Sequence, residues 1–132
     1  MFNLSNLALA DTTVLLLKHP VSEEILYSDT DKKKPASITI FGTSSKNYRA
    51  AITAMQNRSL KRGKKQATAE QLREEGVELL VACSERGANF EYKGKPLLDG
   101  TAFRELYSDP AFSWLKEQVD AALGDTGNFL QA

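Results

Sequence analysis

Cysteine, histidine and tryptophan each occur only once in this 132-residue chain, and long apolar runs are missing. With Cys83 alone no internal disulfide can form, which fits a reducing compartment. His19 stands beside Pro20 in a predicted turn and is a poor partner for a catalytic thiolate. No window approaches the roughly 20 apolar residues of a membrane-spanning helix, and Met1–Lys18 lacks the cationic start of a signal peptide. We therefore expect neither a membrane anchor nor Cys/His catalysis.

The overall composition favours one globular domain. A length of 132 residues leaves room for a single core, and 42% of the residues are hydrophobic. The net charge is zero, yet residues 1–66 carry 11 Lys and Arg against 5 Asp and Glu, whereas residues 67–132 carry 6 against 12. This segregation would let one end of the molecule attract the opposite end of a neighbouring copy.

Extended segments dominate the first third of the chain. Thr12–Lys18 is rich in branched apolar residues and ends just before Pro20, which predicts a strand. Glu24–Tyr27 is its predicted hairpin partner, and the alternation of Ser37–Phe41 predicts a further, half-buried strand. Together these segments indicate a small, mostly antiparallel N-terminal sheet.

Helical periodicity replaces the alternation after the last of these strands. Apolar residues at positions 48, 52 and 55 predict a first helix, capped by the hydroxyl of Thr43 or Ser44. A cationic break is expected at Arg58–Lys65. Thr68 and Gln71 then have capping-box spacing and open a second helix, which we expect to end near residue 84.

Further helical segments complete the predicted architecture. Thr101–Tyr107 can form two helical turns, and Asp109 with Pro110 is a strong start for a last helix that ends with a glycine. A sheet first and three to four helices after it indicate the α+β class. Residues 1–124 are predicted to form one domain, and residues 125–132 a flexible C-terminal tail.

Two groups of residues have part of the chemistry of a ligand site. Gly42–Lys46 places hydroxyls and a lysine between a strand and a helix, where backbone amides can hold phosphate, but it lacks the spacing of a P-loop. Glu74, Glu75 and Glu78 form the densest acidic cluster, without a histidine or second cluster to complete a metal site. We interpret the first as a capped turn and the second as exposed helix surface. No catalytic, cofactor or metal residues are predicted.

Protein contact is the better interpretation of the remaining features. The cationic cluster has no interleaved aromatic residue, so a solvated loop or an electrostatic protein contact is favoured over nucleic-acid binding. Trp114 lies off the apolar stripe of the last helix and is expected to be partly buried, at the core edge or at a contact. Phe129 and Leu130 have no obvious intramolecular partner in the predicted tail. The candidate contact residues are Arg58, Lys61, Arg62, Lys64, Lys65, Trp114, Phe129 and Leu130.

The order of these features resembles the tail assembly chaperones of long-tailed bacteriophages of the siphovirus, lambdoid type. The resemblance spans most of the chain and depends on the order and spacing of short motifs. These are Gly42 with Tyr48-Arg49-Ala50, the Glu-rich helix ending Leu79–Ala82, the turn Gly94–Pro96, the segment Trp114–Val119 and the tail Gly127-Asn128-Phe129. One departure is Ser84–Asn89, where the family pattern often has a tryptophan.

The resemblance implies a non-enzymatic protein of the infected host cytoplasm. Such chaperones self-associate and coat the long, largely helical tape measure protein until tail tube subunits replace them. They typically also exist as a longer, frameshifted form whose extra domain engages the tail tube protein. The alternatives are a permanent minor component of the virion and a small nucleic-acid-binding adaptor that uses residues 58–65. An enzyme is the least favoured, since no pair of groups makes a believable acid, base or nucleophile.

Overall fold

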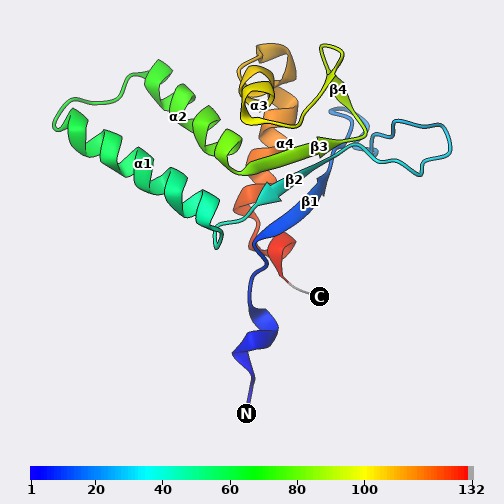
Figure 1. The fold of residues 1–132 in the computed structure, drawn as a ribbon, viewed down its shortest axis with the longest axis horizontal. Coiled ribbons are helices and arrows are strands. Elements are labelled where there is room, and N and C mark those ends of the chain that lie inside the picture. The colour runs from blue at the N-terminus through cyan, green and yellow to red at the C-terminus, as the bar shows by residue number, and fades with distance from the viewer. Residues whose placement is uncertain (131–132) are drawn as a thin grey trace.

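A three-stranded antiparallel sheet and four α-helices form the fold, which the computed structural model describes over residues 1–130 (Figure 1). The strands are β1 (Thr12–Leu16), β2 (Ser37–Phe41) and β3 (Ser84–Ala88), and β2 lies between the other two. Each neighbouring pair is antiparallel. The predicted α+β class with a small antiparallel sheet near the N-terminus is therefore confirmed.

The pairing of β1 with β2 follows from their alternating apolar residues. In this register Leu15 lies opposite Ile38, and Ile38 and Ile40 are fully buried on one face. Val14, on the other face of β1, is 58% exposed. The predicted pairing with Glu24–Tyr27 is present only at the end of the first extended segment, where Lys18 and Ile25 form an antiparallel bridge and the Leu26 amide donates to the Leu17 carbonyl. Strand β1 itself pairs with β2 instead.

Four α-helices follow or connect the strands, and the first three begin at side-chain caps. The four helices are α1 (Lys46–Arg62), α2 (Ala69–Ala82), α3 (Gly100–Tyr107) and α4 (Ser113–Gly124). Thr68 and Gln71 form the predicted capping box of α2, and the Asp99 carboxylate accepts a hydrogen bond at the start of α3. A short hairpin of β4 (Glu91–Tyr92) and β5 (Lys95–Pro96) connects β3 to α3.

The start of α1 differs from the prediction. Ser45 is the cap, and its side chain accepts the amide of Tyr48, whereas Thr43 and Ser44 lie outside the helix. The helix also continues through the expected cationic break as far as Arg62, because nothing before Gly63 interrupts its backbone hydrogen bonding. Arg58, Lys61 and Arg62 are thus helical, and only the last two cations of the cluster lie in the connection to α2.

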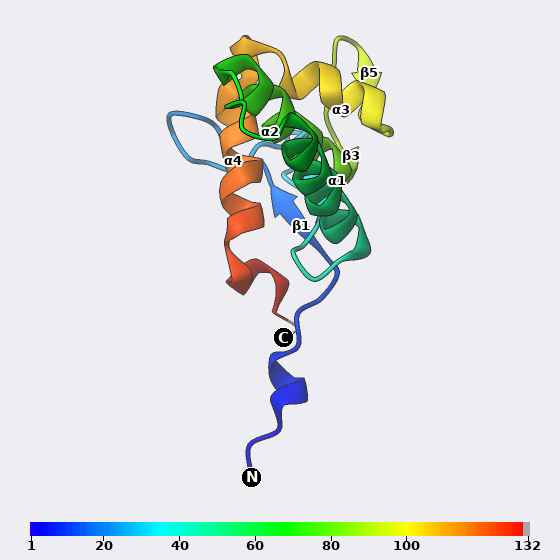
Figure 2. The same ribbon diagram turned by 90° about the vertical axis from the view of Figure 1, so that its left-hand side faces the viewer.

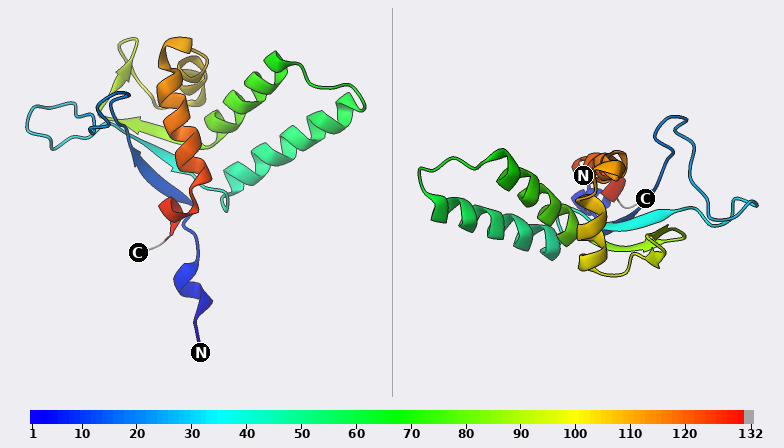
Figure 3. Two further views of the ribbon diagram at one scale, coloured as in Figure 1. Left: turned by 180° about the vertical axis from the view of Figure 1, so that it is seen from behind. Right: turned by 90° about the horizontal axis from the view of Figure 1, so that it is seen from above.

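Buried apolar side chains form one core between the sheet and helices α2, α3 and α4. Helix α4 crosses one face of the sheet, as the view from behind shows (Figure 3). Phe103 and Leu106 of α3 and Val119 of α4 are among its buried side chains, and each is at most 2% exposed. A short 3-10 turn, η2 (Pro110–Phe112), begins at Asp109 and leads into α4.

The segment after α4 belongs to this core, which corrects the prediction of a flexible tail from residue 125. A 3-10 helix, η3 (Thr126–Phe129), begins at the side-chain cap of Asp125, and Phe129 is only 2% exposed. The Phe129 ring occupies space beside Gly42 that a larger residue would fill, because a Cβ there would lie 2.6 Å from ring carbon Cδ1. Residues 131–132 of the predicted tail lie outside the described residues.

The paired helices α1 and α2 and the N-terminal segment both extend away from this core (Figures 1 and 2). Helices α1 and α2 lie side by side as an arm that projects from one edge of the sheet, with α1 on the outer side. The N-terminal segment, which includes a 3-10 turn η1 (Leu4–Leu7), projects in another direction, and its residues 1–8 are exposed.

Candidate functional site

The arm is the feature least explained by the stability of the fold. Helix α1 has 17 residues, and none of them is buried. Its Tyr48, Ile52 and Met55 are half-buried, and α2 is the only element among residues 1–130 with which α1 makes extensive contact. The opposite side of α1 faces solvent over its whole length. A long helix with one unpartnered side is a surface suited to binding another protein.

Cations concentrate at the outer end of this arm. Arg58, Lys61 and Arg62 lie in the last two turns of α1, and Lys64 and Lys65 follow in the connection to α2. Of these five cations, only Arg62 has an ion-pair partner within the described part of the chain, Glu75 at 2.6 Å. The structure therefore brings together the five predicted basic residues and leaves four of them on the surface without such a partner.

The acidic cluster of α2 is used within the molecule. Glu75 pairs with Arg62, and Glu78 accepts two hydrogen bonds from Arg104 of α3. The Arg104 guanidinium, with a smaller contribution from the nearby Arg58, lowers the pKa of Glu78 below its ordinary value. Glu75 and Glu78 thus hold α1 and α3 against α2. Glu74 and Glu78 are exposed, as the sequence predicted, whereas Glu75 is half-buried.

Trp114 lies in a second candidate surface, a groove of about 520 Å³ between α4 and the outer edge of β1. The indole is half-buried, packs on the rim of the core and lies 6.4 Å from the Phe112 ring between centroids. At one end of the groove the Gln118 amide exchanges two hydrogen bonds with the Lys18 backbone, which fixes α4 to the end of β1. Trp114 is thus partly buried, as predicted, and the exposed remainder of its ring lines this groove.

The remaining predicted contact residues, Phe129 and Leu130, are not a free apolar pair. Phe129 is a core residue, so the prediction that it has no intramolecular partner is wrong. Leu130 is 44% exposed and makes an isolated β-bridge with Leu9. The backbone carbonyl of Phe129 also accepts the amide of Ala10. The segment therefore fastens the N-terminal extension to the body.

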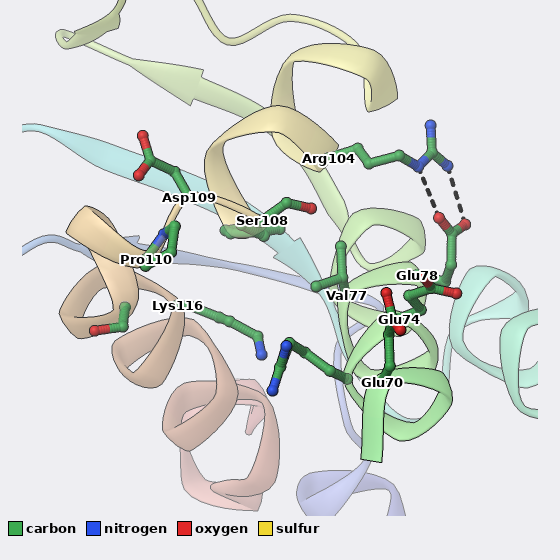
Figure 4. Close-up of a pocket in the computed structure, with 12 residues that line it drawn as sticks. Glu70, Glu74, Val77, Glu78, Arg104, Ser108, Asp109, Pro110 and Lys116 are labelled. Carbon is green, nitrogen blue, oxygen red and sulfur yellow. Dashed lines mark hydrogen bonds and ion pairs between the residues drawn. The ribbon is translucent and has the colours of Figure 1, made fainter. Parts of the chain in front are cut away.

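A third groove, of about 870 Å³, lies where α2, α3 and the start of α4 meet (Figure 4). Its lining mixes both charge signs, with Glu70, Glu74 and Arg73 on α2 and Lys116 on α4. The close-up shows the ion pair of Glu78 with Arg104 at its edge. Such a lining can accept a polar segment of a protein, but it places no nucleophile beside a base.

Other reactive groups in the described residues are occupied or buried. Cys83 is fully buried, and burial raises the pKa of its thiol to about 11. The Ser45 hydroxyl caps α1 and donates to the Gly42 carbonyl, which confirms the capped-turn reading of this phosphate-loop-like segment. Among residues 1–130 no three His, Cys, Asp or Glu side chains are placed to share a metal ion, and no helix has the length and apolarity required to cross a bilayer.

Sequence reasoning missed the outward side of α1 and the groove beside Trp114. The first had a visible signal, because residues 46–66 contain seven Lys and Arg and no Asp or Glu. The second had none, since it brings β1 and α4 together from opposite ends of the chain.

Comparison with protein-family models gave no match, and searches of curated proteins and of solved structures likewise found no similar protein.

Proposed function

We propose that this protein is a phage tail assembly chaperone, which self-associates and binds the tape measure protein during tail morphogenesis. The observation that carries the proposal is the arm, in which α1 leaves one complete side without a partner in the described chain. A helix presented in this way can pack against other helices, and we assign the cationic end of the arm, residues 58–65, to contact with a helical filament. The family resemblance supplies the identity of that filament.

The chemistry of the surface agrees with a temporary coat. Four cations at the arm's end and an aromatic groove near Trp114 provide several modest contacts, and none of them is a deep apolar interface. Many weak contacts give firm binding in total and still permit release when tail tube subunits arrive. In this proposal the protein acts in the cytoplasm of the infected host and changes no covalent bond. The family resemblance further implies a longer frameshifted form that engages the tube protein.

Co-purification with the tape measure protein of the same phage tests the proposal. The tagged chain should keep that protein soluble, and sedimentation at rising concentration should reveal oligomers. Replacing Lys61, Lys64 and Lys65 by Gln should weaken the complex. Replacing Lys32, Lys33 and Lys34 by Gln is the matched control, since it removes the same charge from a different exposed loop and should leave binding unchanged. A strictly monomeric chain that ignores the tape measure protein would contradict the proposal.

The cationic end of the arm also favours one competing function, a nucleic-acid-binding adaptor. Binding of this kind weakens steeply with salt, because phosphate contacts release counterions. Titration with single- and double-stranded nucleic acid at two salt concentrations separates the candidates, and the proposed chaperone should show no affinity at physiological salt. A minor virion component would instead persist in purified particles, from which a chaperone should be missing.

A further inference from the structure

The charged residues on the outward side of α1 are all positive. Lys46 and Arg49 are exposed near its start, and exposed Ala50, Thr53 and Ala54 form a shallow groove beside them. Residues 46–66 hold seven cations and no acidic residue. The acids of α2 lie on the other side of the arm, where Glu75 and Glu78 are already paired. Nothing in α1 itself therefore neutralises this positive side.

The groove beside Trp114 has the opposite character. Its apolar part is formed by Leu16, Trp114 and Ala121, and its rim carries the carboxylates of Glu23, Glu117 and Asp125. Lys18 is the one Lys or Arg side chain in the lining, so acidic groups exceed basic ones by two. The groove follows α4, a helix of 12 residues, and lies beside β1, which is an edge strand of the sheet.

We propose that copies of the chain join head to tail, with residues 46–54 on the outward side of α1 of one copy lying in the Trp114 groove of the next, which leaves the cationic end of the arm free for the tape measure protein. This inference rests on the proposed function, because it assigns the surfaces of the expected self-association. Charge complementarity favours a second copy as the occupant of the groove, because all charged residues of α1 are cationic and the groove has an excess of acidic residues. The small side chains of Ala50 and Ala54 let the helix backbone approach the indole closely.

The geometry of this contact determines the form of the assembly. Residues 46–54 of α1 are about 14 Å long at roughly 1.5 Å per residue, which fits within the length of α4. The two surfaces lie on different parts of the molecule, so the contact is heterologous, and each added copy leaves one arm and one groove free. Such a contact grows into an open row of subunits, as a coat on a filament requires.

Two charge-reversal variants of the full chain test this contact by sedimentation. The arm variant carries Lys46→Glu and Arg49→Glu, and the groove variant carries Glu23→Lys and Glu117→Lys. Each variant alone has like charges on both surfaces, so its dissociation constant should rise at least about tenfold. Mixing the two variants restores opposite charges at every contact, and the mixture should associate as the wild type does.

Matched controls separate this contact from a general effect of charge. Glu85→Lys with Glu91→Lys, and Arg86→Glu with Lys95→Glu, make the same charge changes on β3, β4 and β5 and should leave association unchanged. Circular dichroism verifies folding, and Gln replacements at the same arm and groove positions substitute for any reversal that unfolds the chain. Those neutral variants should weaken association to a smaller degree.

The outcomes distinguish the inference from the proposed function. Variants that associate like the wild type, or a mixture that stays dissociated, would overturn the arm-to-groove contact, while wild-type oligomers and tape measure binding would still support a chaperone. A wild-type chain that is monomeric at every concentration would overturn the contact and contradict the self-association on which it depends.

Discussion

Replacing Phe129 by Ala tests whether the segment after α4 is part of the core. The ring is 2% exposed and lies against Gly42, so its removal leaves a cavity that the surrounding residues cannot readily fill. Phe-to-Ala changes at such sites cost about 3 to 5 kcal/mol. For a chain of 132 residues, with an unfolding entropy of roughly 2.1 cal/mol/K per residue, the midpoint of thermal unfolding should fall by about 11 to 18 °C.

Thermal unfolding followed by circular dichroism measures this change, with Leu130→Ala as the control. Leu130 is 44% exposed, so its truncation should cost less than about 1 kcal/mol. A Phe129→Ala variant that unfolds within about 3 °C of the wild type, yet has lost self-association, would refute the core assignment. It would show instead that this ring is reserved for a partner.

A second variant tests the same packing from the opposite side. An added methyl group in Gly42→Ala would lie 2.6 Å from the Phe129 ring, and such overpacking costs about 1 to 3 kcal/mol. In the Phe129→Ala background that clash has no partner, so Gly42→Ala should cost much less there. Equal costs in the two backgrounds would mean that the residues do not touch.

Three further predictions concern buried or hydrogen-bonded side chains. Because burial raises the pKa of the Cys83 thiol to about 11, a thiol reagent at pH 8 should label the chain only after denaturant unfolds it. Ser84 donates to the Leu80 carbonyl and accepts from the buried Tyr107 hydroxyl at 2.7 Å. Ser84→Ala leaves the buried Tyr107 hydroxyl without a hydrogen-bond partner. It should therefore lower the free energy of unfolding, measured by denaturant titration, by about 1 to 3 kcal/mol, which is more than Tyr107→Phe should cost. Tyr92 donates a hydrogen bond to the Asp109 carboxylate and lowers the pKa of that carboxyl in the folded state. The resulting stabilisation is complete above the pKa of Asp in the unfolded chain, about 3.9, and is lost as the pH falls through the lower pKa of the folded state. In Tyr92→Phe the unfolding midpoint should vary less with pH below about 4.

Local sequence signals were sufficient where a helix or strand is stabilised by its own residues. The capping box of Thr68 with Gln71 and the strand Ser37–Phe41 appear in the structure where they were expected. Asp109 with Pro110 also acts as a start signal, although of the 3-10 turn η2 that leads into α4 and not of α4 itself. All depend on neighbours within a few positions in the chain, so no knowledge of the tertiary fold is required to find them.

Long-range contacts explain what could not be predicted. Strand β3 has the polar sequence Ser-Glu-Arg-Gly-Ala and is extended because β2 pairs with it, not because its residues favour strands. Phe129 follows a glycine that ends a helix, so the sequence predicted that it belongs to a flexible tail. It is buried because Gly42, more than 80 positions earlier, leaves room for its ring. The grooves of the candidate site are likewise built from elements distant in sequence.

The segregation of charge along the chain has a more limited consequence than the sequence suggested. The positive and negative halves meet inside one molecule where α1 lies along α2, and the Arg62–Glu75 pair joins them there. Self-attraction is therefore left to the cations on the outward side of α1 and to acidic groups elsewhere on the surface. Exposed ion pairs contribute about 0 to 1 kcal/mol each, and salt screens them. An assembly held by such contacts must be weak per subunit and strengthened by number, which is the balance required of a coat that later has to dissociate.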